Sequence, residues 1–275
     1  MRRSCLLLPI AMLLAACSAG ERAADAEAAA RAVPMTQSPA ARSLRLPVMR
    51  LAPVMRADAG AAVATVRVRV MFEGRLPPDT TVQARSVDPA CGETFVDTSV
   101  VRNGNAIVGA LVWMDGAGTV FTTVADGEHR PIVTLERCQL RPRMQLAVQG
   151  STIQLVMRDA RVERLVIVPP SIATPIDTIA FNTDGQLVPI RHRTDSTGVL
   201  GIYATRLPWA RAFVAIAPTG VAAVTDADGV ASFAVDRSAK KLTVRAWHPS
   251  LGVVTGTLSP STSGAETTLT LTYRR

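Results

Sequence analysis

The stretch GIYATRLPWARAFVAI, residues 201–216, contains two alternating apolar segments that are separated by Leu207-Pro208-Trp209. Apolar residues that recur with a period of two are typical of β-strands. Proline has no N–H to donate within a sheet, so Pro208 predicts a break between two strands. We therefore expect a strand, a corner and a second strand, and the corner residues Leu207, Pro208 and Trp209 form a candidate binding rim.

The same kind of pattern continues on both sides of this stretch. VATVRVRVMFEG, from Val63, alternates valine with arginine, and AIVGALVWM, 106–114, is typical of a buried strand. MQLAVQGSTIQLVM, from Met144, predicts a hairpin about Gly150. Short strands separated by Gly, Pro, Asp and Ser, with no long helix-period segment after residue 62, are the pattern of an all-β protein. We expect an antiparallel Greek-key β-sandwich.

The N-terminus predicts secretion. Met-Arg-Arg-Ser is followed by CLLLPIAMLLAAC, an apolar run that is too short to cross a bilayer as a stable helix. Leu14-Ala15-Ala16-Cys17 resembles the bacterial lipobox, and this resemblance implies cleavage before Cys17 and acylation of its thiol. Ser18, in place of an aspartate, favours the outer membrane with the protein facing the periplasm. The alternative is an ordinary signal peptide that happens to contain a cysteine.

Two of the four cysteines remain for the folded protein. Cys5 leaves with the signal and Cys17 carries the lipid, which leaves Cys91 and Cys138 in an oxidising compartment. We expect these two to form a disulfide. The alternative is that one of them is a free thiolate that binds a metal.

The chain is basic, with a formal net charge of +8, and nearly all of the positive charge is arginine because Lys240 and Lys241 are its only lysines. Such a surface favours anionic lipid head groups, lipopolysaccharide or an acidic protein partner, or it is an Arg-rich solvated surface with no partner. Nucleic acid is not expected, because the basic residues do not cluster with aromatic residues as single-strand binders require.

Several fragments in order carry a resemblance to a known family. They include FEGRLPP at 72–78, CGE at 91–93, VRNGNAIVGALVWM at 101–114, AVTDADGVASFAV at 223–235 and VRAWHPSLG at 244–252. Together with Pro208-Trp209, they resemble a bacterial secreted family in which a cupredoxin-like (plastocyanin-like) sandwich continues into a carboxypeptidase regulatory-like β-module. The N-terminal pattern predicts a signal peptide at 1–16, and the Ala/Arg/Pro-rich composition predicts a mostly disordered tether at 17–62. The resemblance implies the cupredoxin-like sandwich at 63–215 and the smaller module at 216–275.

Copper-binding members of that family carry a histidine four residues after the loop aspartate and a Cys-x-x-His-Pro-Trp-Met corner. At the matching positions this chain has Glu163, Ala204, Leu207 and Ala210. A blue-copper site needs a thiolate and two imidazoles, and no cysteine lies after Cys138. We therefore expect no metal and no cofactor. A non-standard copper site is the alternative, and it would draw on the histidines or on a methionine: His129, His192, His248, Met144 and Met157.

Other polar motifs have simpler interpretations. Asp226-Ala227-Asp228-Gly229 begins like a calcium loop but lacks its later acidic ligands, so we expect a hairpin turn there, as at Asp184-Gly185. His248, in the Trp-His pair of the resemblance, is expected to bond nearby backbone, and it is kept as a candidate contact beside the rim. His192 lies between two arginines, on a solvated loop or at an anion site.

The chain has no nucleophile elbow, no His-Glu-x-x-His and no phosphate-binding glycine loop, so we do not expect an enzyme. The expected function is binding or scaffolding by a lipoprotein at the cell envelope, anchored through Cys17, with an envelope protein or a glycan as the partner. The alternatives are copper-dependent electron transfer and binding of carbohydrate or peptidoglycan. Three Trp, two Tyr and six Phe leave few aromatic side chains for a sugar site.

Overall fold

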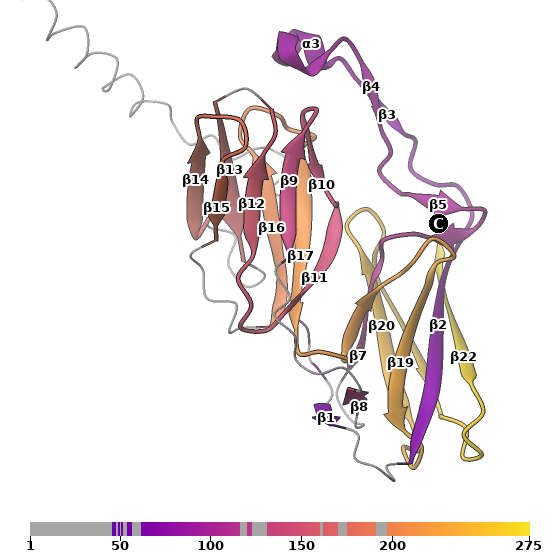
Figure 1. The fold of residues 1–275 in the computed structure, drawn as a ribbon. Helices are drawn as coiled ribbons and strands as arrows, with labels where there is room; N and C mark the ends of the chain where they lie inside the picture. Colours follow the sequence, from indigo (N-terminus) through magenta and orange to yellow (C-terminus); the bar gives the residue numbers. More distant parts are fainter. Residues whose placement is uncertain are drawn as a thin grey trace, which may run out of the picture. The chain divides into compact units, whose positions relative to one another are not determined.

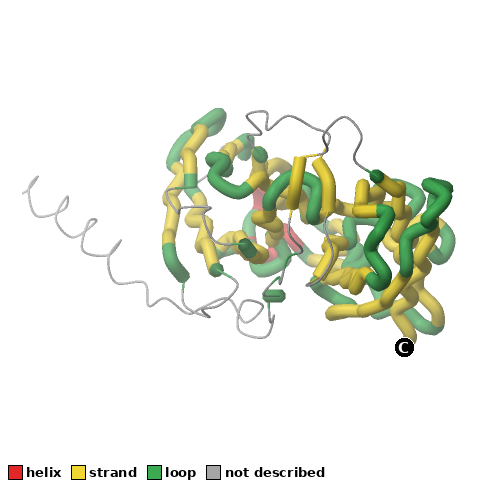
Figure 2. The backbone as a smooth tube through the Cα atoms, turned by 90° about the horizontal axis from the view of Figure 1, so that it is seen from below, coloured by secondary structure: helices red, strands yellow, loops and turns green. Residues whose placement is uncertain are grey.

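The fold is taken from a computed structural model of the chain (Figure 1). It describes residues 46–47, 49, 51, 54–56, 62–115, 120–122, 131–159, 162–169, 175–190 and 197–275. Strands and loops make up almost all of this part of the chain, with very little helix (Figure 2). The prediction of an all-β sandwich protein is therefore confirmed.

The inserted sandwich, as we call the strands between Ile132 and Ala217, consists of two sheets. Its four-stranded sheet has the order β10 (Gln139–Arg141), β9 (Ile132–Glu136), β12 (Gln154–Met157) and β15 (Leu187–Pro189). Its five-stranded sheet has the order β11 (Met144–Val148), β17 (Arg211–Ala217), β16 (Gly198–Ala204), β13 (Glu163–Val168) and β14 (Asp177–Phe181). β16 and β17 are antiparallel neighbours on either side of the Leu207-Pro208-Trp209 corner, as predicted.

The split sandwich, as we call the seven-stranded sheet and the second four-stranded sheet, is formed from chain on both sides of the inserted one. The larger sheet has the order β1 (Val54–Arg56), β8 (Val120–Thr122), β19 (Val230–Asp236), β2 (Val63–Glu73), β6 (Ala106–Ile107) and β5 (Arg102–Asn103), with β22 (Thr267–Arg274) also paired to β2. The smaller sheet has the order β18 (Ala222–Val224), β7 (Leu111–Asp115), β20 (Leu242–His248) and β21 (Gly252–Leu258).

The predicted boundary at residues 215/216 does not follow these sheets. β2 pairs along its length with β19 and with β22, so residues 63–73 belong with the C-terminal strands and not with the inserted sandwich. Strand pairing joins segments that are distant in sequence, and local composition carries no sign of it.

An arm connects β2 to β5. It contains the two-stranded ladder of β3 (Thr80–Val82) and β4 (Phe95–Asp97), and between these strands lie the short helix α3 (Ala84–Val87) and the 3₁₀ turn η1 (Pro89–Cys91) (Figure 1). Ala84 is fully buried, and Val82, Cys91 and Phe95 pack against the core of the inserted sandwich. The arm therefore leaves one sandwich and covers part of the other.

The two central strands β16 and β17 are buried on both faces. One face, with Leu200, Ile202 and Val214, belongs to the core of the inserted sandwich. The other face, with Tyr203 and Phe213, belongs to the core of the split sandwich, and the Phe213 ring meets the Trp247 ring edge-on at 5.4 Å. Burial on both faces explains why this stretch is almost uninterruptedly apolar.

Two predictions about strands are wrong. The segments around Gly150 do not form a hairpin, because β11 pairs in parallel with β17 and β12 pairs in parallel with β9, in different sheets. The expected strand at 106–114 is divided between β6 and β7, which also lie in different sheets. In both cases the apolar residues are buried as expected, but a turn sends the chain across the sandwich.

A turn forms at Asp226–Gly229 as expected, but it does not close a hairpin, because β18 pairs with β7 while β19 pairs with β2 and β8 in the other sheet. Asp226 Oδ1 accepts from the backbone N–H groups of Asp228 and Val230, and Gly229 has a φ of 70°. Positive φ is unstrained only for glycine, so its place after Asp228 is required by the turn.

Part of the predicted tether is structured. Leu46 and Met49 are buried in the core of the split sandwich, and Val54–Arg56 forms β1, which pairs in parallel with β8. Leu46, Met49 and Val54–Arg56 of the predicted tether therefore belong to the chain's own fold. The predicted signal and Cys17 lie outside the described residues.

Candidate functional site

The candidate rim is a tight loop between β16 and β17. The Ala204 N–H donates to the Ala210 carbonyl at 3.0 Å, and the Ala210 N–H donates to the Leu207 carbonyl at 2.9 Å. Leu207 is fully buried, Trp209 is 8% exposed, and Pro208 alone of the three is exposed. The rim therefore offers little free apolar surface.

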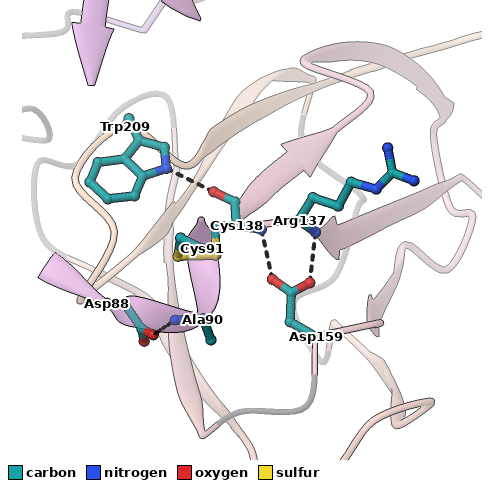
Figure 3. Close-up of a disulfide and its surroundings, with 7 residues drawn as sticks. All are labelled: Asp88, Ala90, Cys91, Arg137, Cys138, Asp159 and Trp209. Carbon is teal, nitrogen blue, oxygen red and sulfur yellow. Dashed lines mark hydrogen bonds between the residues drawn. A yellow bond between two sulfur atoms is a disulfide. The ribbon is translucent and has the colours of Figure 1, made fainter. Parts of the chain in front are cut away.

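The arm contributes to the burial of Trp209. Phe95 of β4 meets the Trp209 ring edge-on, with 5.4 Å between ring centroids. The Trp209 indole N–H donates to the Cys138 carbonyl at 2.8 Å (Figure 3). A buried indole N–H needs such an acceptor, so the ring is held both by packing and by its one polar group.

A disulfide fastens the arm at the same place. Cys91 of η1 and Cys138 are bonded, with their Cα atoms 5.5 Å apart (Figure 3). The predicted disulfide is confirmed, and the alternative of a free thiolate ligand is wrong. The bond ties the tip of the arm to the turn that joins β9 and β10.

That turn contains two residues with left-handed backbone, Arg137 at φ 50° and Cys138 at φ 60°. A two-residue hairpin loop of this kind usually contains asparagine and glycine, because other side chains are strained there. Here the carboxylate of Asp159 accepts both N–H groups, from Arg137 at 2.6 Å and from Cys138 at 2.7 Å (Figure 3). These two charge-assisted bonds offset the strain and position Cys138 for the disulfide.

We predict that Asp159→Ala lowers the free energy of unfolding by about 2–4 kcal/mol, since two backbone N–H groups lose a charged acceptor. Asp159→Asn, which keeps one carbonyl acceptor, should lose about half as much. Urea denaturation of the three proteins measures the difference. An Asp159→Ala protein as stable as the parent would show that the carboxylate does not support the turn.

The four residues that were compared with copper ligands, Glu163, Ala204, Leu207 and Ala210, lie around the same loop. Glu163 is buried and its Oε1 accepts from Thr205 Oγ1 and from the Arg206 N–H, both at 3.3 Å. Its Oε2 is buried with no hydrogen-bond partner in the part of the chain that the structure describes. Ala204, Leu207 and Ala210 are buried beside it in the core of the inserted sandwich. One carboxylate among alkyl groups is not a donor set for copper.

His248 lies away from the rim, at the end of β20 in the split sandwich. Its Nδ1 accepts from the Ser250 N–H at 3.2 Å, in agreement with the predicted bond to nearby backbone. Burial, and then the charges of Arg143 and Arg211, lower the pKa of His248 from its usual 6.5 to about 4. The ring is therefore neutral at pH 7, and it is not part of the candidate rim.

This pKa predicts an acid-sensitive fold. The unfolded chain protonates His248 near pH 6.5 and the folded protein only near pH 4, so unfolding takes up a proton between these values. The free energy of unfolding should fall as the pH drops from 7 to 4, by about 3 kcal/mol from this residue. His248→Asn should remove that part of the slope. An unchanged slope in the variant, measured by denaturation at several pH values, would contradict the assignment.

Residues that sequence reasoning missed lie next to His248. Asp97, Arg143 and Arg211 form an ion-pair cluster in which both guanidiniums contact one carboxylate. The sequence does not show that they meet, because they lie on three separate strands or loops of an Arg-rich chain. Their only local sign is that Asp97 ends a strand next to apolar residues.

Among the described residues, no three His, Cys, Asp or Glu side chains gather closely enough to hold a metal ion. His129 and His192, which the alternative copper site requires, lie outside the described residues. No helix in the described ranges is both long and apolar enough to cross a membrane.

Comparison with known proteins finds likeness in structure only. No protein-family model and no curated protein sequence matches the chain. The amicyanin of Paracoccus versutus is 16% identical and matches with a TM-score of 0.28, over 34% of this chain and 85% of its own. A purple cupredoxin from Nitrosopumilus maritimus is 14% identical, with a TM-score of 0.26 over 31% of this chain and 98% of its own. The copper-containing nitrite reductase of Thermus scotoductus is 12% identical, with a TM-score of 0.28 over 54% of this chain and 28% of its own. Likeness at this level assigns neither a family nor a function.

Proposed function

We propose that this chain is a non-catalytic lipoprotein of the cell envelope, anchored at the outer membrane through Cys17, whose two sandwiches serve in binding or scaffolding. The observation that supports a non-redox role is the disulfide-anchored arm over the loop between β16 and β17. The arm leaves Leu207 and Trp209 buried, so the loop offers little surface to a redox partner. The buried residues of this loop stabilise the folded state.

The side chains of the loop support the same conclusion. Electron transfer through blue copper requires a thiolate and imidazoles at fixed positions, and the matching positions are Glu163, Ala204, Leu207 and Ala210. Cys91 and Cys138 are consumed in the disulfide. A disulfide between separate parts of the fold is itself consistent with an oxidising compartment such as the periplasm.

Lipidation is tested by expressing the full chain in a bacterial host that is fed an alkyne fatty acid. The parent should incorporate the label and appear in the outer-membrane fraction, while Cys17→Ala should do neither. Equal labelling of both proteins, or a parent that stays soluble, would contradict the anchor. Crosslinking in the labelled cells then identifies the protein or glycan that is bound.

Copper titration of the purified protein tests the main alternative function. We expect no stoichiometric binding and no thiolate-to-copper absorption band. Tight binding of one copper ion per chain would overturn the non-redox proposal, and loss of that binding in His248→Asn would locate the site.

A further inference from the structure

A cavity of about 210 Å³ lies where the loop after the arm, strands β11 and β17, and the turn after β20 meet. Its polar wall includes Arg143, Arg211, His248 and Ser99, and its apolar wall includes Met144 and Phe213. The cavity is separate from the loop at Leu207–Trp209, and neither the copper positions nor the lipid anchor is part of it.

The charges at this cavity do not balance. Arg143 donates to Asp97 Oδ1 and, at 2.9 Å, to the Thr98 carbonyl, while Arg211 lies 3.7 Å from Asp97 Oδ2. Within the described ranges, Asp97 is the one carboxylate at salt-bridge distance from either guanidinium. His248 is neutral at pH 7, so two cations share one anion and a single positive charge is in excess.

This excess charge is largely removed from water. The Arg143 side chain is 34% exposed, that of Arg211 22%, and that of Asp97 9%. A partly buried charge without a partner is costly, and a planar guanidinium is well suited to a carboxylate. The Ser99 hydroxyl in the same wall has no hydrogen-bond partner in the part of the chain that the structure describes.

The remaining wall selects against a strongly hydrated ion. Phe213 and Met144 offer apolar surface beside the arginines, together with Val101, Val108 and Pro142. The volume is below the roughly 300–1,000 Å³ of sites for drug-sized ligands, so the part of a ligand inside it must be small. Next to the cavity is a wider groove of about 520 Å³, which shares Thr98, Val101, Pro142 and Arg143 as lining residues and adds Val96, Gln139 and Arg141.

We propose that this cavity is a binding site for a small organic monocarboxylate, with the carboxylate between Arg143 and Arg211 and the apolar body against Phe213 and Met144. The inference goes beyond the proposed function and does not depend on lipidation at Cys17. A longer carboxylate would extend from the cavity into the neighbouring groove.

Isothermal titration calorimetry of the purified protein tests the site with benzoate, with benzamide as the uncharged analogue of the same shape, and with inorganic phosphate. Benzoate should bind at one site and at least tenfold more tightly than either of the others. Binding of benzamide as tight as that of benzoate would refute the role of the arginines. Phosphate binding as tight as that of benzoate would refute the proposal that the site prefers an organic carboxylate.

Two variants with opposite expected effects, and one control variant, complete the test. Arg211→Gln should weaken benzoate binding at least tenfold, while Arg69→Gln, which alters an exposed arginine on β2, should leave it unchanged. Asp97→Asn removes the competing carboxylate and should strengthen benzoate binding severalfold. If Arg211→Gln does not fold, the Asp97→Asn protein tests the proposal by itself. Unchanged or weaker benzoate binding in a folded Asp97→Asn protein would overturn the proposal.

Discussion

Replacing both disulfide cysteines, as in Cys91→Ser/Cys138→Ser, is expected to lower the free energy of unfolding by about 4 kcal/mol. The bond closes a loop between positions 47 residues apart, and the chain-entropy model relates loops of this length to that loss. The effect is expected to be large because the bond also holds the arm against the inserted sandwich. Ala84 of the arm and Trp209 of the loop are both buried in that core. Urea denaturation followed by circular dichroism measures the loss.

Reduction supplies the control for this prediction. The parent protein in a strong reductant should match the double variant, and the double variant should not respond to the reductant. If the reduced parent were as stable as the oxidised one, the arm would be held by packing alone and the disulfide would have no structural role.

Trp209→Ala is expected to cost about 3–5 kcal/mol, the range for truncating a large buried aromatic side chain. The variant loses the edge-on contact with Phe95, and it leaves the Cys138 carbonyl without the indole donor. Trp209→Phe keeps much of the packing and should cost about 1–2 kcal/mol for the lost hydrogen bond. Val96→Ala, at an exposed position of the same arm, should change stability by less than about 0.5 kcal/mol.

The Trp209 and disulfide variants should not be additive. Once the disulfide is gone, the arm is free to leave the loop, so Trp209→Ala removes contacts that are already weakened. We expect a coupling of at least about 0.5 kcal/mol in a double-mutant cycle. Full additivity would mean that the ring is buried by the inserted sandwich alone. That outcome would refute the covering role of the arm.

The rim shows where interpretation of the sequence alone was incomplete. Leu207-Pro208-Trp209 predicted a corner between two strands, and the corner is present. The same three residues were expected to form a binding surface, but Leu207 and Trp209 are covered. The covering residues Cys91 and Phe95 lie more than a hundred positions earlier in the chain, so no local pattern at the corner reports them.

The amino-acid sequence by itself determined the fold class, most strand positions, the Asp226–Gly229 turn and the pairing of Cys91 with Cys138. The strands and the turn follow from periodicity and turn chemistry among neighbouring residues, and the disulfide follows from the count of cysteines in the whole chain. The tertiary structure alone decided which strands share a sheet, that one sandwich is inserted in the other, and that Arg143, Arg211 and Asp97 meet at one cavity. Strand pairing and charge clustering depend on long-range geometry, and a β-strand pairs with any segment whose buried face fits.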